Sequence, residues 1–302
     1  MGHDLDNFMD MTQHLRNPPS DHFGSTPSHH DEAGLADMLD LDADVLGPYL
    51  AEVTEWAARH APVAPATVID VGAGTGTGSL ALARQFGAAE IVAIDTSELM
   101  LERIRTAALD HGLADRLRVV QADVDVALPV VGAVDVAWAA SSLHHLADPD
   151  RVLRDIHAAL NPGGLLVVIE MDGLPRFLPD DLGVGEPGLE VRCHRALAEL
   201  GWNAHPDWRP HLERAGFDIV EQRRFTIAAT PVPPKTGRYA RAFLSRVRSA
   251  LDGRLATDDI DALDHLLMDG GPDALLRQRD LTMCGSRTAW AARRPSSRRA
   301  EE

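Results

Sequence analysis

Aspartates and alternating glycines are the residue types with the clearest chemistry in this sequence. Asp70 is followed by three glycines at every second position, Gly72, Gly74 and Gly76. Glycines at this spacing let the backbone turn sharply and let a ligand approach the main chain closely. Asp95 follows Gly76 by 19 positions, close to the spacing of an acid that accepts hydrogen bonds from both hydroxyls of a ribose. The pattern predicts a cofactor site.

Two kinds of cofactor would compete for such a loop. A dinucleotide site requires Gly-x-Gly-x-x-Gly, in which the third glycine lets the helix pack closely against the strand. Counting from Gly72 places Thr77 at the third position, and counting from Gly74 places Ser79 there, so both frames fail. The additional acid Asp70 would repel a pyrophosphate but suits a ligand that carries an amino group. The loop therefore disfavours a nicotinamide dinucleotide.

The elements that must position these residues alternate between strand and helix. Apolar runs typical of buried strands occur at residues 67–71, 91–95, 117–123, 134–140, 165–170, 217–227 and 281–292. This alternation predicts an α/β fold with a doubly wound, mostly parallel sheet and helices on both of its faces. Ligands of such sheets bind beyond the carboxyl ends of the strands, where Asp70, Asp95 and Asp123 would come together.

The first 33 residues lie outside this alternation. They are rich in His, Pro, Ser and Asp, and we expect a polar, partly disordered arm, with a lid over the cleft as the alternative. His22, His29 and His30 would suggest a metal. Because no carboxylate or cysteine stands at a spacing typical of zinc sites, an exposed polar arm is the favoured interpretation, and we predict no metal site.

Three further segments complete the expected organisation. Residues 34–63 have apolar side chains at helical spacing and predict an N-terminal helical cap, in which Pro48 separates two helices or starts the second. Residues 64–295 form the main domain. Its helical insertion at about 236–279 would cover the cleft or form the face of a homodimer. Residues 296–302 are expected to be a disordered tail.

Composition and charge narrow the classes of function. The formal net charge of −17 disfavours a nucleic-acid surface, although solubility alone also explains it. Cys193 and Cys284 form neither a disulfide framework nor a zinc cluster and fit a reducing compartment. The sequence shows no secretory pattern and no apolar run long enough to cross a bilayer. We expect a cytoplasmic protein that acts on a small molecule and binds neither nucleic acid nor membrane.

Six motifs in order resemble those of class I S-adenosylmethionine-dependent methyltransferases that act on small molecules. They occupy residues 68–76, 93–95, 121–123, 134–138, 143–149 and 160–164. The resemblance covers residues 64–172 strongly and the last two strands more weakly. It implies a seven-stranded Rossmann-like sheet with an antiparallel last strand, and an enzyme that uses S-adenosylmethionine.

The resemblance also implies which residues contact the cofactor. They are Asp70, Gly72, Ala73, Gly74, Gly76, Asp95, Thr96, Met100, Asp123, Val124 and Ala139. Asp70 would face the methionine amino group directly or through water, and Asp95 would accept from the ribose hydroxyls. Asp123 would accept from the adenine amino group, and the backbone carbonyl of Ala139 from the methionine amino group.

Methyl transfer from a sulfonium is an in-line displacement in which proximity, orientation and exclusion of water supply much of the acceleration. A general base is needed only if the acceptor must lose a proton. His144 and His145 are the candidates for that role, and packing near the cofactor is the alternative for both. Glu170, Asp172 and Trp202 are candidate substrate contacts, or they cap and pack a loop.

Functions of two classes remain open at this point. The leading hypothesis is an enzyme that transfers a methyl group to a small organic acceptor. The alternative is a noncatalytic S-adenosylmethionine-binding sensor or partner subunit on the same fold. Residues 139–142 read Ala-Ala-Ser-Ser, so the Asn-Pro-Pro-Tyr or Asp-Pro-Pro-Tyr tetrad of amino-group methylation on purines or glutamine is missing. The acceptor atom is not encoded in any motif that we can identify.

Overall fold

The computed structural model describes residues 29–183, 185–202, 207–228, 231–268 and 281–296. The side chains of residues 29–31 lie outside this description. The strands are β1 Thr67–Val71, β2 Glu90–Asp95, β3 Leu117–Gln121, β4 Val134–Ala140, β5 Leu160–Met171, β6 Asp218–Ala228 and β7 Cys284–Arg293. The helices are α1 His29–His60, α2 Thr77–Gln85, α3 Glu98–Asp110, α4 Pro149–Ala159, α5 Leu189–Glu199, α6 Trp208–Arg214, α7 Thr236–Ala250 and α8 Thr257–Leu267, with a short 3₁₀ helix at Leu143–His145.

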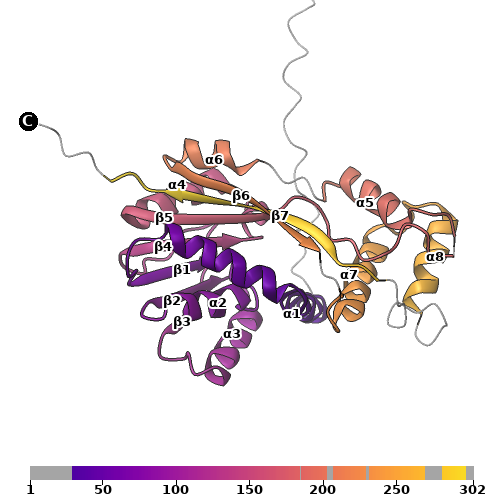
Figure 1. Ribbon diagram of the computed structural model, residues 1–302, viewed down its shortest axis with the longest axis horizontal. Helices are drawn as coiled ribbons and strands as arrows, with labels where there is room; N and C mark the ends of the chain where they lie inside the picture. The colour runs from indigo at the N-terminus through magenta and orange to yellow at the C-terminus, as the bar shows by residue number, and fades with distance from the viewer. Residues whose placement is uncertain (1–28, 184, 203–206, 229–230, 269–280, 297–302) are drawn as a thin grey trace, which may run out of the picture.

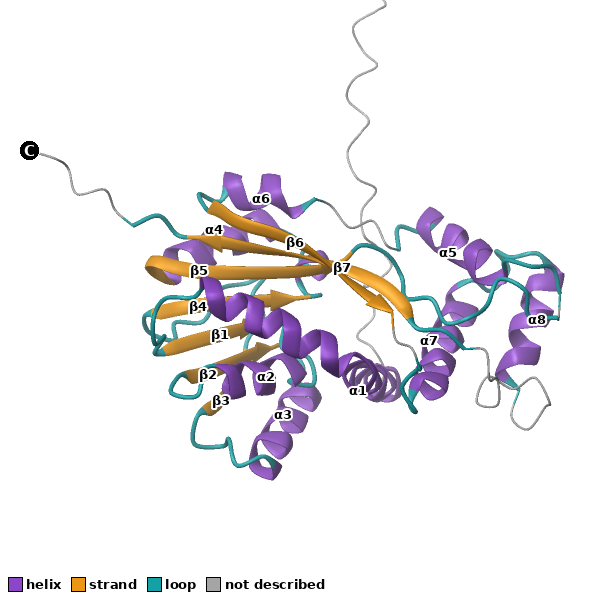
Figure 2. Ribbon diagram, viewed as in Figure 1, coloured by secondary structure: helices purple, strands orange, loops and turns teal. Residues whose placement is uncertain are grey.

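All seven strands form one sheet in the order β3-β2-β1-β4-β5-β7-β6. The first five are parallel to one another, and β7 runs antiparallel between β5 and β6. The order reverses direction between β1 and β4, which creates the switch point where a cleft opens beyond the strand ends. Figure 2 shows β4 pointing toward the side on which the first part of α1 and a group of further helices lie. The predicted doubly wound sheet with an antiparallel last strand is confirmed.

Helices cover both faces of the sheet because successive strand residues point to opposite sides. In β5, Leu165, Val167 and Ile169 join a core formed with α1, α2 and α3. Leu166 and Val168 join a second core formed with α4 and α6. Strands buried on both faces explain the continuous apolar runs in the sequence.

Helix α1 differs from the expected arrangement in two ways. It begins at His29, inside the segment expected to be a polar arm, and the remainder of that arm lies outside the described residues. It also continues through Pro48 as one assigned helix rather than two. A proline inside a helix removes one backbone hydrogen bond and bends the axis. Accordingly, Figure 1 shows one part of α1 end-on and the other running across the sheet.

A helical lobe stands beside the sheet and contains α5, α7 and α8 (Figure 1). Its core includes Leu197 of α5, Phe243 of α7 and Leu263 of α8. Leu46 of α1 is buried in the same core. The helices α7 and α8 lie within the helical insertion that the sequence predicts at about 236–279, and residues 269–279 lie outside the described part of the chain. The lobe also includes α5 from the β5–β6 connection, because α5 buries its apolar face in this core and not against the sheet.

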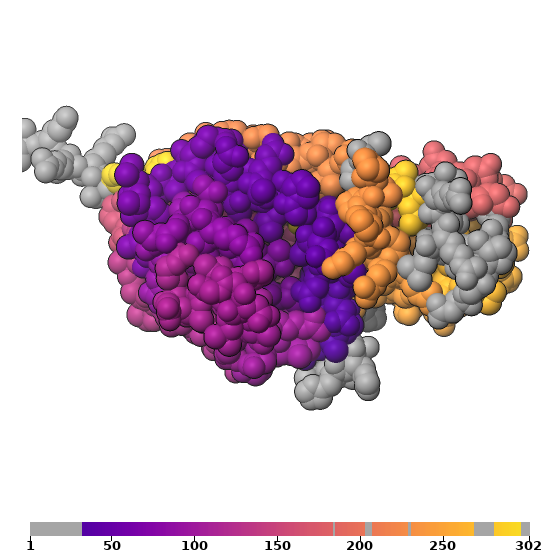
Figure 3. Space-filling model, turned by 60° about the horizontal axis from the view of Figure 1, so that its bottom comes forward, coloured from indigo at the N-terminus to yellow at the C-terminus, as the bar shows by residue number. Residues whose placement is uncertain are grey.

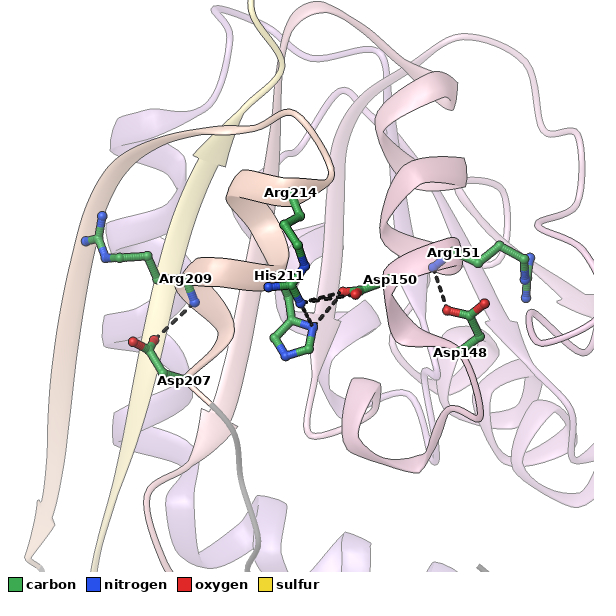
Figure 4. Close-up of polar contacts among 7 residues, drawn as sticks. All are labelled: Asp148, Asp150, Arg151, Asp207, Arg209, His211 and Arg214. Atoms are coloured by element: carbon green, nitrogen blue, oxygen red, sulfur yellow. Dashed lines mark hydrogen bonds and ion pairs between the residues drawn. The ribbon is translucent and has the colours of Figure 1, made fainter. Parts of the chain in front are cut away.

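Polar side chains fix the helices that cover the second face. Asp148 accepts a hydrogen bond of 3.0 Å from the Arg151 amide and caps α4, as the Asp-Pro sequence predicts. Asp150 then contacts Nδ1 of His211 at 2.6 Å and the guanidinium of Arg214 at 3.0 Å. Figure 4 shows this cluster between α4 and α6, with the matching aspartate cap at the start of α6. It docks α6 on α4.

Candidate cofactor and acceptor site

The glycine loop follows β1 and has the backbone conformation that only glycine adopts readily. Gly72, Gly74 and Gly76 have φ angles of +72°, +55° and +85°. A Cβ atom added to Gly72 would lie 2.5 Å from Cβ of Ser142, and one added to Gly76 would lie 2.5 Å from Cγ1 of Ile104. The glycines are therefore required both by the turn and by the close packing of the β4 end and α3 around it.

Asp95, at the end of β2, ties this loop to the next one. Its Oδ2 accepts a hydrogen bond of 2.8 Å from the Gly74 amide, and its Oδ1 accepts one of 3.0 Å from the Ser97 amide. Burial raises its pKa, and the two amide bonds oppose that rise. Each carboxylate oxygen has two lone pairs, so both still have capacity to accept from a ribose hydroxyl. The Ser97 hydroxyl in turn accepts from the Met100 amide and caps α3.

Asp70 is buried beneath the loop instead of facing the open edge of the sheet. Its side chain is directed to α2, where Oδ2 accepts a hydrogen bond of 2.6 Å from the Ser79 hydroxyl. Burial raises its pKa to about 7, the Ser79 bond opposes the rise, and the charge of Asp95 adds to it. In this structure Asp70 anchors the start of α2, and its predicted contact with an amino group would have to act across the loop.

The other predicted cofactor residues surround the same edge to different degrees. Thr96 and Asp123 are exposed, and Oδ1 of Asp123 accepts a hydrogen bond of 2.8 Å from the Asp125 amide. Met100 and Val124 are buried, so only a small part of either side chain reaches the surface. Ala73 is half-buried in the loop, and Ala139 is fully buried one residue before the end of β4. The roles of these residues remain predictions.

The first part of α1 covers the glycine loop, which sequence reasoning did not foresee beyond a general lid. Leu39 lies over Gly74, with Cδ1 3.4 Å from where a Cβ would stand. Glu32 accepts a hydrogen bond from the Ser97 hydroxyl, and Arg103 of α3 donates to Asp37 at 2.6 Å. Figure 3 shows α1 in indigo between the magenta surface of the sheet domain and the orange surface of α7. Within the loop, Thr75 and Gly76 are buried, whereas Gly72 is exposed.

The end of β4 holds a strained turn and a paired histidine. Ser141 has a φ angle of +52°, and its buried hydroxyl has no hydrogen-bond partner among the described residues. The Ser142 hydroxyl donates to the Val71 carbonyl at 2.8 Å and so joins this turn to the glycine loop. His144 Nδ1 lies 2.7 Å from Glu170 Oε2, and the ring of His145 lies 3.9 Å from that of His144 between centroids, tilted by 49°. Glu170 is 1% exposed and also accepts from the Leu143 amide.

The predicted substrate residues do not form one group. Glu170 holds His144 on one side of the sheet, whereas Asp172 accepts from the Thr288 hydroxyl at 2.6 Å and pairs with Arg224 at 2.8 Å. Trp202 packs against the core of the helical lobe. Glu170 and Asp172 are thus each bound to a different neighbouring element, and their roles as substrate contacts remain predictions.

The connection between β5 and β6 contains further tryptophan and histidine residues. Trp208 lies in the core under α6. His194 is largely buried in α5, where burial lowers its pKa to about 4. His205 lies outside the described residues. The burial of Trp208 and His194 within the protein accounts for both side chains without a contact to substrate.

The chemistry of the loops fits a cationic nucleoside cofactor. Residues 71–78, 95–97 and 122–126 contain no Arg or Lys that would pair with a pyrophosphate. The amino end of α2 has no side-chain cap on its first amides, so it can accept a carboxylate. Asp95 supplies acceptors for a ribose, and the buried charge of Asp70 favours a positive ligand. The described residues include no group of three or more His, Cys, Asp or Glu side chains suited to a metal ion.

Comparisons with known proteins agree with this geometry. A family model described as a methyltransferase domain matches residues 68–164. A ubiquinone biosynthesis O-methyltransferase of Caulobacter vibrioides is 30% identical over 200 residues, which are 64% of this chain and 73% of that relative. The chain belongs to the class I S-adenosylmethionine-dependent methyltransferase family.

Other relatives of this methyltransferase chain match shorter parts. Methyltransferase GfsG of Streptomyces halstedii is 32% identical over 169 residues, which are 55% of this chain and 58% of GfsG. The C-methyltransferase UbiE of Hahella chejuensis is 36% identical over 109 residues, 35% of this chain and 43% of that protein. The chain therefore matches about half the length of these two relatives.

A solved structure supports the fold of the methyltransferase chain. A Bacillus halodurans protein described as a candidate methyltransferase superposes with a TM-score of 0.52 at 19% identity, over 82% of this chain and 98% of that one. At this identity the likeness concerns the fold alone. None of the helices in the described part of the chain has the length and apolar character needed to cross a membrane.

Proposed function

We propose that this chain transfers a methyl group from S-adenosylmethionine to a small organic acceptor. The observation that carries the proposal is the hydrogen bond between Asp95 and Gly74, which joins a ribose-binding acid to a glycine loop free of phosphate-binding side chains. When bound, S-adenosylmethionine supplies a methyl carbon on a positively charged sulfur, which leaves with the bond electrons as the acceptor attacks. Family membership supports the proposal, and the acceptor is inferred to be small because the acidic chain is unsuited to nucleic acid.

The chain contributes binding, orientation and exclusion of water. The carboxylate of Asp95 would hold the ribose, and the amides at the start of α2 would hold the methionine carboxylate. Leu39 and the other covering residues of α1 would keep water away from the reacting atoms. Positioning of this kind accounts for much of the acceleration expected for a displacement with a good leaving group.

Replacing Asp95 with alanine should weaken S-adenosylmethionine binding about 10- to 100-fold, because a charge-assisted hydrogen bond contributes roughly 1.5–3 kcal/mol. Isothermal titration calorimetry with S-adenosylmethionine and with NAD measures the effect. Asp207→Ala is the matched control, since Asp207 also accepts from a backbone amide, that of Arg209 at the start of α6. No binding of S-adenosylmethionine by the unmodified chain would refute the proposed cofactor. Unaltered affinity in Asp95→Ala would refute the ribose assignment alone.

A second test separates an enzyme from a noncatalytic sensor. The chain and S-adenosylmethionine are incubated with fractions of a metabolite extract, and products are detected by a mass increase of one methylene. Formation of a methylated product together with S-adenosylhomocysteine supports an enzyme. Tight cofactor binding without turnover on any fraction would favour the sensor.

His144 is the residue that we propose as general base where the acceptor must lose a proton. Glu170 accepts from Nδ1 when the ring carries its proton there, and Nε2 is then the basic nitrogen. Glu170 acts as a positioning residue, because it is almost fully buried and is itself fixed by the Leu143 amide. The alternative of simple packing near the cofactor predicts no effect on the pH profile.

Replacing His144 with glutamine should lower kcat about 100- to 10,000-fold on such an acceptor and abolish the rise of kcat/KM with pH. Glu170→Gln should reduce kcat less, because it leaves the imidazole of His144 in place. His145→Gln is the control, since it removes the neighbouring imidazole, 3.9 Å away between ring centroids, and leaves the pair of His144 and Glu170 in place. If His144→Gln kept the rate and the pH profile of the unmodified chain, His144 would have only a packing role.

A further inference from the structure

One face of α1 lies over the two loops that Asp95 joins. Glu32 and Leu39 are seven positions apart, about two helical turns, and therefore share a face of the helix. Leu39 approaches Gly74, and Glu32 accepts a hydrogen bond from the Ser97 hydroxyl. Gly74 and Ser97 are also the residues whose amides donate to Asp95. This face of α1 therefore contacts both loops beside the acid that is proposed to hold the ribose.

Glu32 is a second carboxylate at this place. Glu32 and Asp95 are both half-buried, so part of each residue remains accessible. The Ser97 amide donates to Asp95 at 3.0 Å while the Ser97 hydroxyl donates to Glu32, so one residue links the two acids. Burial raises the pKa of Asp95, and the negative charge of Glu32 adds to that rise. Two carboxylates thus lie close together beyond the end of β2.

The described residues supply no cation that neutralises this pair. Arg103 of α3 is near this part of α1, but it pairs with Asp37 and Asp40. No Lys or Arg among the described residues forms an ion pair with Glu32 or Asp95. Neighbouring carboxylates repel each other, and hydroxyl donors reduce that cost because ionised carboxylates only accept hydrogen bonds. A ligand with adjacent hydroxyl groups therefore suits the pair.

The two acids differ in how much acceptor capacity they retain. Each oxygen of Asp95 already accepts one amide hydrogen bond, from Gly74 or from Ser97. Glu32 accepts through Oε1, and its Oε2 accepts no hydrogen bond from the described residues. Each carboxylate oxygen can accept two hydrogen bonds. Glu32 is thus the less committed acceptor of the two.

Contacts farther along α1 hold this face in position. Asp37 pairs with Arg103 at 2.6 Å, on the side of the cofactor loops. Asp42 accepts from the Tyr239 hydroxyl at 2.6 Å and from Arg287 of β7 at 3.1 Å, on the side of the helical lobe. A carboxylate on a segment fixed from two sides loses little freedom when a ligand binds.

We propose that Glu32 shares the ribose hydroxyls of S-adenosylmethionine with Asp95 and accepts a hydrogen bond from one of them. The inference rests on the proposed methyltransferase function. It adds a residue of α1 to the cofactor site, outside residues 68–164 that the family model matches. The Ser97 hydroxyl keeps Glu32 oriented, and α1 is a wall of the cofactor site in addition to a cover over the glycine loop.

The test uses the full chain with S-adenosylhomocysteine and its 2′-deoxy and 3′-deoxy counterparts, and calorimetry measures the affinity for each. Glu32→Gln keeps an oxygen for the Ser97 hydroxyl but removes the charge. The variant should bind S-adenosylhomocysteine about 5- to 20-fold more weakly, because a charged acceptor is replaced by a neutral one. For one of the two deoxy ligands the loss should be less than about 3-fold, since the hydroxyl that Glu32 holds is already missing.

Asp37→Asn is the matched control, since Asp37 lies on the same part of α1 and pairs with Arg103 of α3. Looser docking of α1 should weaken all three ligands by the same factor. Chemical denaturation checks that both variants are folded. An equal loss for all three ligands in Glu32→Gln, or no loss for any of them, would overturn the role of Glu32. Failure of the unmodified chain to bind S-adenosylmethionine or S-adenosylhomocysteine would instead refute the cofactor on which this inference rests.

Discussion

Gly72→Ala should lower the free energy of unfolding by about 2–5 kcal/mol. Two costs add at this position. A φ angle of +72° costs a residue with a Cβ roughly 1–2 kcal/mol, and a Cβ 2.5 Å from Ser142 Cβ forces overpacking of roughly 1–3 kcal/mol. Chemical denaturation of the chain without ligand measures the change. Cofactor affinity should fall as well, because the same contact sets the course of the loop.

Two other glycines separate these costs. Gly112 has a φ angle of +66° and nothing within 4 Å of an added Cβ, so Gly112→Ala should show the conformational cost alone. Gly87 has open space and no positive φ, so Gly87→Ala should be neutral or slightly stabilising. If Gly72→Ala were no worse than Gly112→Ala, the close contact with Ser142 would have no energetic weight.

Asp70→Asn should make the stability of the chain less dependent on pH and should stabilise it at pH 8. The pKa of Asp70 is raised by burial to about 7 in the folded state, from about 4 in an unfolded chain. The folded state therefore binds more protons between pH 4 and 7, and stability falls as the pH rises through that window. At about 1.4 kcal/mol per pKa unit, the variant should gain on the order of 4 kcal/mol above pH 7. Denaturation between pH 5 and 8 measures the slope.

The same carboxyl group should link cofactor binding to pH. A positively charged ligand favours the ionised form of Asp70, so S-adenosylmethionine should bind about 10-fold more tightly at pH 8 than at pH 5.5 and should release protons on binding. Calorimetry in two buffers of different ionisation enthalpy detects that release. Both effects should disappear in Asp70→Asn.

Glu190 provides the matched control for this experiment. Burial raises its pKa to about 7 as well, but it accepts from the Phe177 and Leu178 amides in the helical lobe. Glu190→Gln should alter the pH dependence of stability and leave proton release on cofactor binding intact. Equal loss of proton release in both variants would contradict the assignment to Asp70.

Local signals explain which features the sequence could predict. Ser97 and Asp148 cap helices through bonds three residues along the chain, and such contacts depend only on neighbouring residues. The strands follow from apolar runs, and their parallel arrangement follows from alternation with helices. The contact between Gly74 and Asp95 can also be predicted from the sequence, because the first two strands of such a fold are adjacent and their ends meet.

Long-range packing explains what the sequence could not predict. The residues at Asp70 and Ser79 are both visible in the sequence, but the direction of a buried carboxylate depends on which helix covers it. Arg287 and Asp42 are 245 positions apart, and no periodicity relates them. Glu170 and Asp172 share one face by strand alternation, yet their partners lie on different elements.

The bend at Pro48 allows one helix to serve both parts of the molecule. Before it, Asp37 contacts Arg103 of α3 beside the glycine loop, whereas Asp42 and Asp44 contact Arg287 and Lys235 beside the helical lobe. Any tilt of this segment would change both sets of contacts together. A ligand of the proposed cofactor site that displaced this segment would therefore also change its contacts with the helical lobe.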